Sequence, residues 1–350
     1  MREGQVGGVV ELLERGHGMR LIWGDYGTGK THMLDIAEEI ARSRGWLTAR
    51  IVLDPVEMPP SHPLSLYRAI VESLAHPDEV ARGLEPLFRR LVDSPEHAVP
   101  GASRASRFYT PFLHALRSDG TSLLDWMRDY VDGCYMDVDE GNARLKRSGW
   151  QGQRLLTLSD YRTYGRMYAH LVGTLACWAR DAGHQGLLLL FDEVEFVESL
   201  SKELLGYAAE VIKHYAAVCL PPERLSFDPE ALYRGGQAVH RALPLRFAPD
   251  QPLCALCALT PLDFVRELFR DILADGDDDL SLPPLRRADQ LELCERVESL
   301  YLRAYAPWRP EQDELAPLRI RLHGLLDATE GAPRAIVRSA VLGLDALRLS

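Results

Sequence analysis

The segment MRLIWGDYGTGKTHML (residues 19–34) places a short apolar run before a glycine-rich loop, with an amphipathic stretch after it. Glycines at 24, 27 and 29 permit backbone angles that other residues avoid, so successive N–H groups can point toward one anion. Between a strand and a helix, the pattern G-x-x-x-x-G-K-[ST] is typical of a phosphate-binding loop. We therefore predict that a nucleotide's phosphates are bound by Gly24, Asp25, Tyr26, Gly27, Thr28, Gly29, Lys30, Thr31 and His32.

Lys30 is one of only four lysines among 40 basic residues, and it lies inside this loop. The pattern predicts that its ammonium reaches the β and γ phosphates and that the Thr31 hydroxyl binds Mg²⁺. The helix that begins here adds its positive amino-terminal end. The alternative is a glycine-rich turn that binds nothing, which the complete pattern in this context disfavours.

Four apolar segments around the loop predict a parallel α/β fold. Strands are expected at 19–24, 46–54, 185–196 and 252–260, and helices at 32–45 and 199–217. Strand, loop, helix and strand in this order indicate a βαβ unit. The continuous apolar run QGLLLLF suits a strand covered on both faces.

The remaining chain is mostly helical in pattern. A helix-rich insertion is predicted at about 62–183, within an α/β domain over 1–280, and its polar stretch 139–154 is expected to form a loop. After the acidic loop 273–284, a small all-helical lid is predicted over 285–350. The fold class is thus a P-loop NTPase sheet with a helical insertion and a helical lid.

Two acids end the predicted strand at 185–196. Asp192 is expected to hold Mg²⁺, and Glu193 to orient or deprotonate an attacking water. The alternative is a strand cap with two solvated acids, which the glycine loop makes less favourable. Glu195 and Glu198 are expected to be surface acids on the next turn.

Three other positions are candidates for the site. Thr260 ends a strand expected beside that of Asp192, near the γ phosphate, or it simply caps a helix before Pro261. Arg334 begins a helix after GAP and can point back to the phosphates, or remain solvated. Arg286 and Arg287 are candidates for an arginine finger inserted into a neighbouring subunit's site.

The six cysteines lie mostly in apolar segments, which favours reduced thiols. Cys254 and Cys257 are expected to pack in the core rather than bind zinc. The formal charge of −11 and the sequence pI of about 5.5 give no overall basic field for nucleic acid. Since no apolar segment is long enough for a membrane span, a cytoplasmic location without membrane contact is expected.

GDYGTGKTHML, LLLLFDEVE, a strand ending in Thr260 and the late GAPR resemble P-loop ATPases of the AAA+ type, on the origin-recognition initiator branch. With LELCERVESLYLRAY (291–305), the sequence looks most similar to the ATP-binding family of bacterial BREX phage-defence systems. The resemblance implies a first sensor at Thr260 and a second sensor at Arg334. Initiators usually continue into a winged-helix DNA-binding domain, whereas this sequence stops soon after the expected lid, which puts direct sequence-specific DNA binding in doubt. DNA contact is kept as a possible interaction that the net charge does not support.

We therefore predict an Mg²⁺-dependent ATPase that switches conformation or oligomerises with ATP and ADP, within a multi-protein, DNA-directed defence complex. Its catalytic residues are predicted to be Glu193, Lys30, Thr260 and Arg334. The alternative is a regulatory or scaffold protein that binds nucleotide, hardly hydrolyses it, and signals through protein contacts. A small-molecule kinase shares the glycine loop but needs neither the acid pair nor the GAPR segment.

Overall fold

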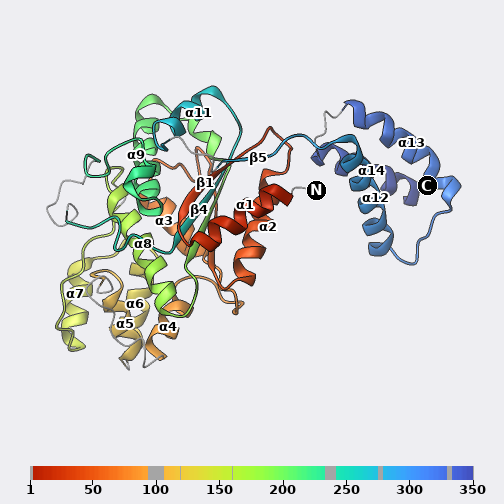
Figure 1. The fold of residues 1–350 in the computed structure, drawn as a ribbon. Helices are drawn as coiled ribbons and strands as arrows, with labels where there is room; N and C mark the ends of the chain where they lie inside the picture. The colour runs from red at the N-terminus through yellow and green to blue at the C-terminus, as the bar shows by residue number, and fades with distance from the viewer. Residues whose placement is uncertain are drawn as a thin grey trace.

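The sheet at the centre of the molecule has five strands, and every pairing between them is parallel. The computed structural model describes residues 3–93, 106–118, 120–159, 161–232, 242–274, 279–328 and 333–349. Within them the strand order is β2-β3-β4-β1-β5 (Figure 1). The strands are β1 (Gly18–Trp23), β2 (Leu47–Val52), β3 (Leu187–Asp192), β4 (Leu253–Leu259) and β5 (Leu280–Ser281). The predicted α/β class and parallel sheet are confirmed. Between β1 and β2 lie β3 and β4, which come later in the chain.

Helices cover both faces of this sheet, as the side-chain alternation of β3 demonstrates. Leu188 and Leu190 pack with α1 (Glu3–Arg15) and α2 (Lys30–Ser43), whereas Leu187 and Leu189 belong to the cluster on the opposite face. That face is covered by α3 (Pro63–Ser73), α8 (Gly165–Asp181) and α9 (Lys202–Cys219). Because successive side chains of a strand point to opposite faces, an all-apolar strand requires this double cover.

In the described residues of the predicted helix-rich insertion, four helices lie between α3 and α8 along the chain, at the lower left of Figure 1. They are α4 (Glu85–Asp93), α5 (Thr110–Arg117), α6 (Thr121–Val131) and α7 (Val138–Arg147). Aromatic side chains join them to the main core, with Phe88 against Phe112 and Trp178. The insertion is therefore part of the same hydrophobic core as one face of the sheet.

The expected loop at 139–154 is wrong over its first half, which forms α7. Asp137 caps this helix by accepting hydrogen bonds from the N–H groups of Asp139 and Glu140. Arg144 donates to Glu140 one turn earlier, at 3.0 Å. Only Gly141 and Leu145 are buried, so the helix lacks the apolar stripe that reveals helices in a sequence.

The last part of the described chain contains α12 (Arg287–Ala304), α13 (Gln312–Ala328) and α14 (Pro333–Leu349). These three helices pack on one another through two clusters of their own, centred on Cys294 and Tyr301, and lie to the side of the sheet in Figure 1. The short strand β5 precedes them and pairs with β1. The predicted domain boundary at 280–285 thus begins at β5 itself, and it stays a prediction.

Shorter elements connect these layers. A 3-10 helix, η2 (Val194–Ser199), follows β3 directly. A second, η3 (Pro222–Arg224), follows α9, and α11 (Asp263–Arg270) follows β4. The helix expected at 199–217 is observed as α9, shifted to begin at Lys202. Across the described ranges, no helix is both long and apolar enough to span a membrane.

Candidate functional site

The glycine loop joins β1 to α2 at the carboxyl end of the sheet. Gly27 and Gly29 have φ angles of 79° and 94°, in the region that favours glycine, and Gly29 is the N-cap of α2. Because Gly29 has no side chain, the first N–H groups of α2 receive no side-chain cap. Thr28 closes the loop internally by donating its hydroxyl to the Asp25 carbonyl at 2.8 Å. This backbone suits an anion at the helix amino terminus.

The nine predicted loop residues differ in exposure. Lys30 and Thr28 are buried, whereas the side chains of Asp25, Tyr26, Thr31 and His32 face solvent. The Nδ1 atom of His32 lies 3.9 Å from Asp35 Oδ2, three residues further along α2. The chemistry of the loop therefore centres on Lys30.

The Lys30 ammonium makes contacts with three parts of the fold. It donates to the Gly24 carbonyl at 3.0 Å and to the Thr260 hydroxyl at 2.9 Å. Its Nζ also lies 3.5 Å from Glu195 Oε1. Thr260 follows β4, and β4 is the neighbour of β3, as the sequence predicted. The structure thus brings Lys30, Thr260 and the segment after β3 together.

Asp192 ends β3 with its side chain almost completely buried. One of its oxygens, Oδ2, accepts a hydrogen bond from Arg50 Nη2 of β2 at 2.9 Å. The same guanidinium contacts Asp35 Oδ1 at 3.0 Å and the Thr31 carbonyl at 3.4 Å. Arg50 therefore links the predicted metal ligand Asp192 to the first turn of α2, a role that the sequence analysis missed.

Glu193 has an unusual backbone for a residue with a side chain. Its φ of 58° and ψ of 33° make it the one non-glycine residue with positive φ in the described ranges. Burial raises the pKa of its carboxyl group, and the charges of Glu195 and Asp192 raise it further, while Lys30 and Arg334 act in the opposite direction. A half-buried carboxyl group with a raised pKa, held in a strained turn, suits a proton acceptor.

The expectation that Glu195 is a surface acid is wrong. Its side chain is only 12% exposed, and Oε1 accepts a hydrogen bond from the Thr260 hydroxyl. Glu198, on the same 3-10 helix, is exposed as expected. The tight turn of η2 directs Glu195 back over the end of the sheet, toward Lys30. The sequence DEVE (residues 192–195) includes Glu195, but it does not predict the direction in which the turn points this side chain.

Arg334, in the first turn of α14, reaches the glycine loop by way of Tyr26. Its Nη1 donates to the Tyr26 hydroxyl at 2.7 Å, and its guanidinium carbon lies 5.2 Å from the centre of the ring. Gly331 and Ala332 of the GAPR segment lie outside the described residues. Arg286 is exposed at the N-cap of α12, while Arg287 donates to the His323 carbonyl. Neither arginine contacts the loop through these bonds.

The cysteines of β4 lie on opposite faces of the sheet. Cys254 belongs to the cluster under α1 and α2, and Cys257 to the larger cluster on the other face. Burial raises the pKa of both thiols. All six cysteines carry free thiols. Cys254 and Cys257 are three positions apart on β4, and side chains an odd number of positions apart on a strand point to opposite faces of the sheet. The two thiols therefore cannot bind the same metal ion.

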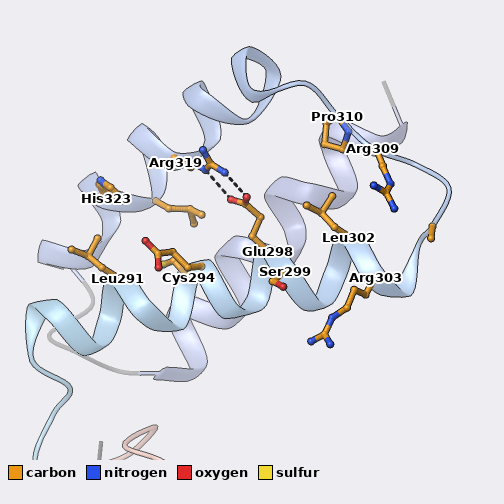
Figure 2. Close-up of a pocket in the computed structure, with 13 residues that line it drawn as sticks. Leu291, Cys294, Glu298, Ser299, Leu302, Arg303, Arg309, Pro310, Arg319 and His323 are labelled. Carbon is orange, nitrogen blue, oxygen red and sulfur yellow. Dashed lines mark hydrogen bonds and ion pairs between the residues drawn. The ribbon is translucent and has the colours of Figure 1, made fainter.

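A separate hollow of about 820 Å³ is lined by α12, α13 and the segment that joins them. Figure 2 shows it between α12 and α13, where Arg319 forms an ion pair with Glu298. Leu291, Leu302 and Leu322 contribute apolar lining. Every residue that lines it falls between 291 and 323, so this hollow is distinct from the glycine loop.

The donor groups around the loop fit a nucleotide with a divalent cation. Lys30 and the uncapped amino terminus of α2 supply positive charge for phosphate oxygens. Thr31 and Asp192 carry the oxygen ligands that Mg²⁺ prefers. The Oε2 atom of Glu195 is buried, with no hydrogen-bond partner among the described residues. This oxygen can therefore still accept a hydrogen bond at this end of the sheet.

Part of the chain matches a known protein-family model. The family model described as "BREX system ATP-binding protein BrxC/D" matches residues 5–110. Searches among curated proteins and among solved structures found no match. The matched segment contains the glycine loop and Arg50, but the acids after β3, Thr260 and Arg334 lie beyond it. Over these 106 of the 350 residues, the sequence is similar to that family of ATP-binding proteins.

Proposed function

We propose that this chain binds ATP at residues 24–32 and hydrolyses it with Mg²⁺. The observation that carries the proposal is the position of the Lys30 ammonium, which is buried between the glycine loop and the Thr260 hydroxyl. A buried cation beside an uncapped helix amino terminus is the arrangement that a polyphosphate requires. The match to an ATP-binding family over residues 5–110 agrees with it.

Hydrolysis needs a water activated beside the γ phosphate. In our proposal Glu193 takes a proton from this water as its oxygen bonds to the γ phosphorus, and the bond to the bridging oxygen of ADP breaks. Lys30 and Thr260 stabilise the charge on the phosphate oxygens, and Arg334 approaches from α14. Thr31 and Asp192 are the proposed Mg²⁺ ligands, and the bound cation would neutralise phosphate charge.

Two substitutions test these roles separately. Lys30→Ala should weaken ATP binding at least about tenfold, because a charge-assisted hydrogen bond to phosphate is lost. Glu193→Gln should leave ATP affinity unchanged and slow phosphate release by about 10²- to 10⁴-fold, because the proton acceptor is lost. Calorimetric titration and steady-state phosphate assays measure the two effects. Normal hydrolysis by both variants would remove these residues from their roles.

We further propose that nucleotide turnover drives a switch or motor in a multi-protein, DNA-directed phage-defence complex, on the AAA+ initiator-like branch. The net charge of −11 does not favour direct DNA contact, so partner proteins or a homo-oligomer are the proposed setting in the cytoplasm. Arg286 or Arg287 is the proposed finger for a neighbouring site. Light scattering with ATP and without nucleotide tests for assembly, which should increase the particle mass.

A second candidate function is a nucleotide-binding switch with little hydrolysis. Two ion pairs favour it, because both Lys30 and Asp192 already have partners of opposite charge from the chain itself. Phosphate release measured with and without DNA and partner proteins separates the two candidates. A turnover that stays negligible under all of these conditions would favour the switch.

A further inference from the structure

The Lys30 ammonium has three N–H donors, and three protein oxygens surround it. The Gly24 carbonyl and the Thr260 hydroxyl lie at hydrogen-bonding distance, and Glu195 Oε1 lies at 3.5 Å. The lysine side chain is only 8% exposed, so little water is available to complete its shell. A phosphate oxygen can therefore bind Lys30 only if one of these contacts is released.

Glu195 is the contact with the opposite charge. Its carboxylate accepts from the Thr260 hydroxyl through Oε1, while Oε2 is buried and has no hydrogen-bond partner in the described ranges. A buried carboxylate is costly unless a cation lies close to it. Among the residues that the structure describes, Lys30 is the cation found within ion-pair distance of Glu195.

We propose that Glu195 occupies Lys30 in the nucleotide-free protein and must be displaced when a nucleoside polyphosphate binds. The carboxylate competes with phosphate oxygens for the same ammonium, and its negative charge also repels them. Glu195 is thus a positioning residue that lowers nucleotide affinity. This inference rests on the proposed nucleotide site, and it assigns to that site an internal competitor.

The place of Glu195 in the chain gives the competition a structural consequence. It lies on η2, between Glu193 and the start of α9. A carboxylate that loses Lys30 to phosphate becomes an uncompensated charge, so η2 must move it toward solvent or toward another donor. Occupancy of the phosphate site is thereby coupled to the segment that carries the proposed proton acceptor.

The test compares Glu195→Gln with Glu198→Gln, a matched change on the exposed side of the same 3-10 helix. Affinities for ATP and ADP are measured by calorimetry in EDTA, so that no metal contributes. We expect Glu195→Gln to bind both nucleotides about tenfold more tightly than the wild type, within the usual range of a coupling between sites. Glu198→Gln should bind them as the wild type does.

A purely structural role for Glu195 predicts unchanged or weaker affinity in the Gln variant, and either result overturns the inference. If Glu195→Gln does not fold, Glu195→Asp withdraws the carboxylate from Lys30 while keeping its charge. It should tighten binding to a smaller extent, and unchanged or weaker affinity there would equally overturn the inference. A wild-type protein that binds neither nucleotide refutes the proposed function itself, whereas binding without a gain in the variants refutes only the role of Glu195.

Discussion

Arg50 and Asp192 form an ion pair between two adjacent strands, with 2.9 Å between Nη2 and Oδ2. The carboxylate is 4% exposed and the guanidinium 18% exposed, so water screens the pair only weakly. Arg50 belongs to β2 and Asp192 to the last position of β3. A cation of the chain therefore neutralises the proposed Mg²⁺ ligand.

The first prediction concerns the loss of this cation. Arg50→Gln should lower the free energy of unfolding in EDTA by about 2–4 kcal/mol, because a buried carboxylate is left unpaired. Millimolar Mg²⁺ should restore part of this loss by binding Asp192, and should raise the melting temperature of the variant more than that of the wild type. Thermal melts in EDTA and in Mg²⁺ measure both effects.

The matched control is Arg44→Gln, which removes an ion pair with Glu14. In this pair the Arg44 side chain is 39% exposed and the Glu14 side chain 62% exposed. It should change stability by less than about 1 kcal/mol and show no dependence on Mg²⁺. If Arg50→Gln behaves like this control, Arg50 does not compensate Asp192.

The second prediction concerns the pH dependence of turnover. Glu193 must be deprotonated to accept a proton, and burial together with the charges of Glu195 and Asp192 raises its pKa. The ratio kcat/KM, which reports the nucleotide-free protein, should therefore rise with pH across a limb that lies above the ordinary titration range of glutamate. In Glu195→Gln this limb should move to lower pH, since one of the raising charges is removed. A limb that keeps its position in this variant contradicts the assignment.

The third prediction concerns the contact between α14 and the glycine loop. Tyr26→Ala removes both the ring and the hydroxyl that Arg334 contacts, while Tyr26→Phe keeps the ring. Hydrogen exchange in the first turn of α14 should be fastest in the Ala variant and intermediate in the Phe variant. Tyr135→Ala, at a highly exposed tyrosine outside this contact, should leave that exchange unchanged. Equal exchange in all variants would show that the contact does not hold α14.

The sequence predicts the strands of the sheet better than it predicts the side-chain contacts at their carboxyl ends. Apolar runs identify β1 to β4, and the glycine loop marks the turn before α2. Arg50 is a charge within a strand that otherwise reads as apolar, yet its partner Asp192 is 142 residues away along the chain. Long-range pairs of this kind follow from strand order, which local periodicity does not contain. Glu195 was missed because the direction of a 3-10 turn depends on the φ of the preceding residue.

The fourth prediction concerns thiol reactivity. Cys134 is partly exposed, and the other five cysteines are buried. An aromatic disulfide reagent should modify one thiol quickly in the native protein and the remaining five only on unfolding. Cys134→Ser should abolish the fast phase. Rapid modification of Cys254 or Cys257, located by peptide mapping, would contradict the packing of these two side chains within the sheet.

The fifth prediction concerns a carboxyl group that weakens the fold at neutral pH. Burial raises the pKa of Asp132 from 3.8 to about 6, and the charges of Asp129, Glu72 and Glu85 contribute. The folded state therefore binds more protons than the unfolded state between these two values, so the free energy of unfolding falls as pH rises through this window.

Asp132→Asn removes the free-energy cost of the buried charge. At pH 8 it should stabilise the protein by about 1–2 kcal/mol, reduced for partial exposure, and the gain should vanish near pH 4. Asp132 is the C-cap of α6, and the matched control is Asp271→Asn at the exposed C-cap of α11. This control should show no such pH-dependent gain in denaturant titrations. A gain in Asp132→Asn that is the same at both pH values would mean that the charge of Asp132 is not its source.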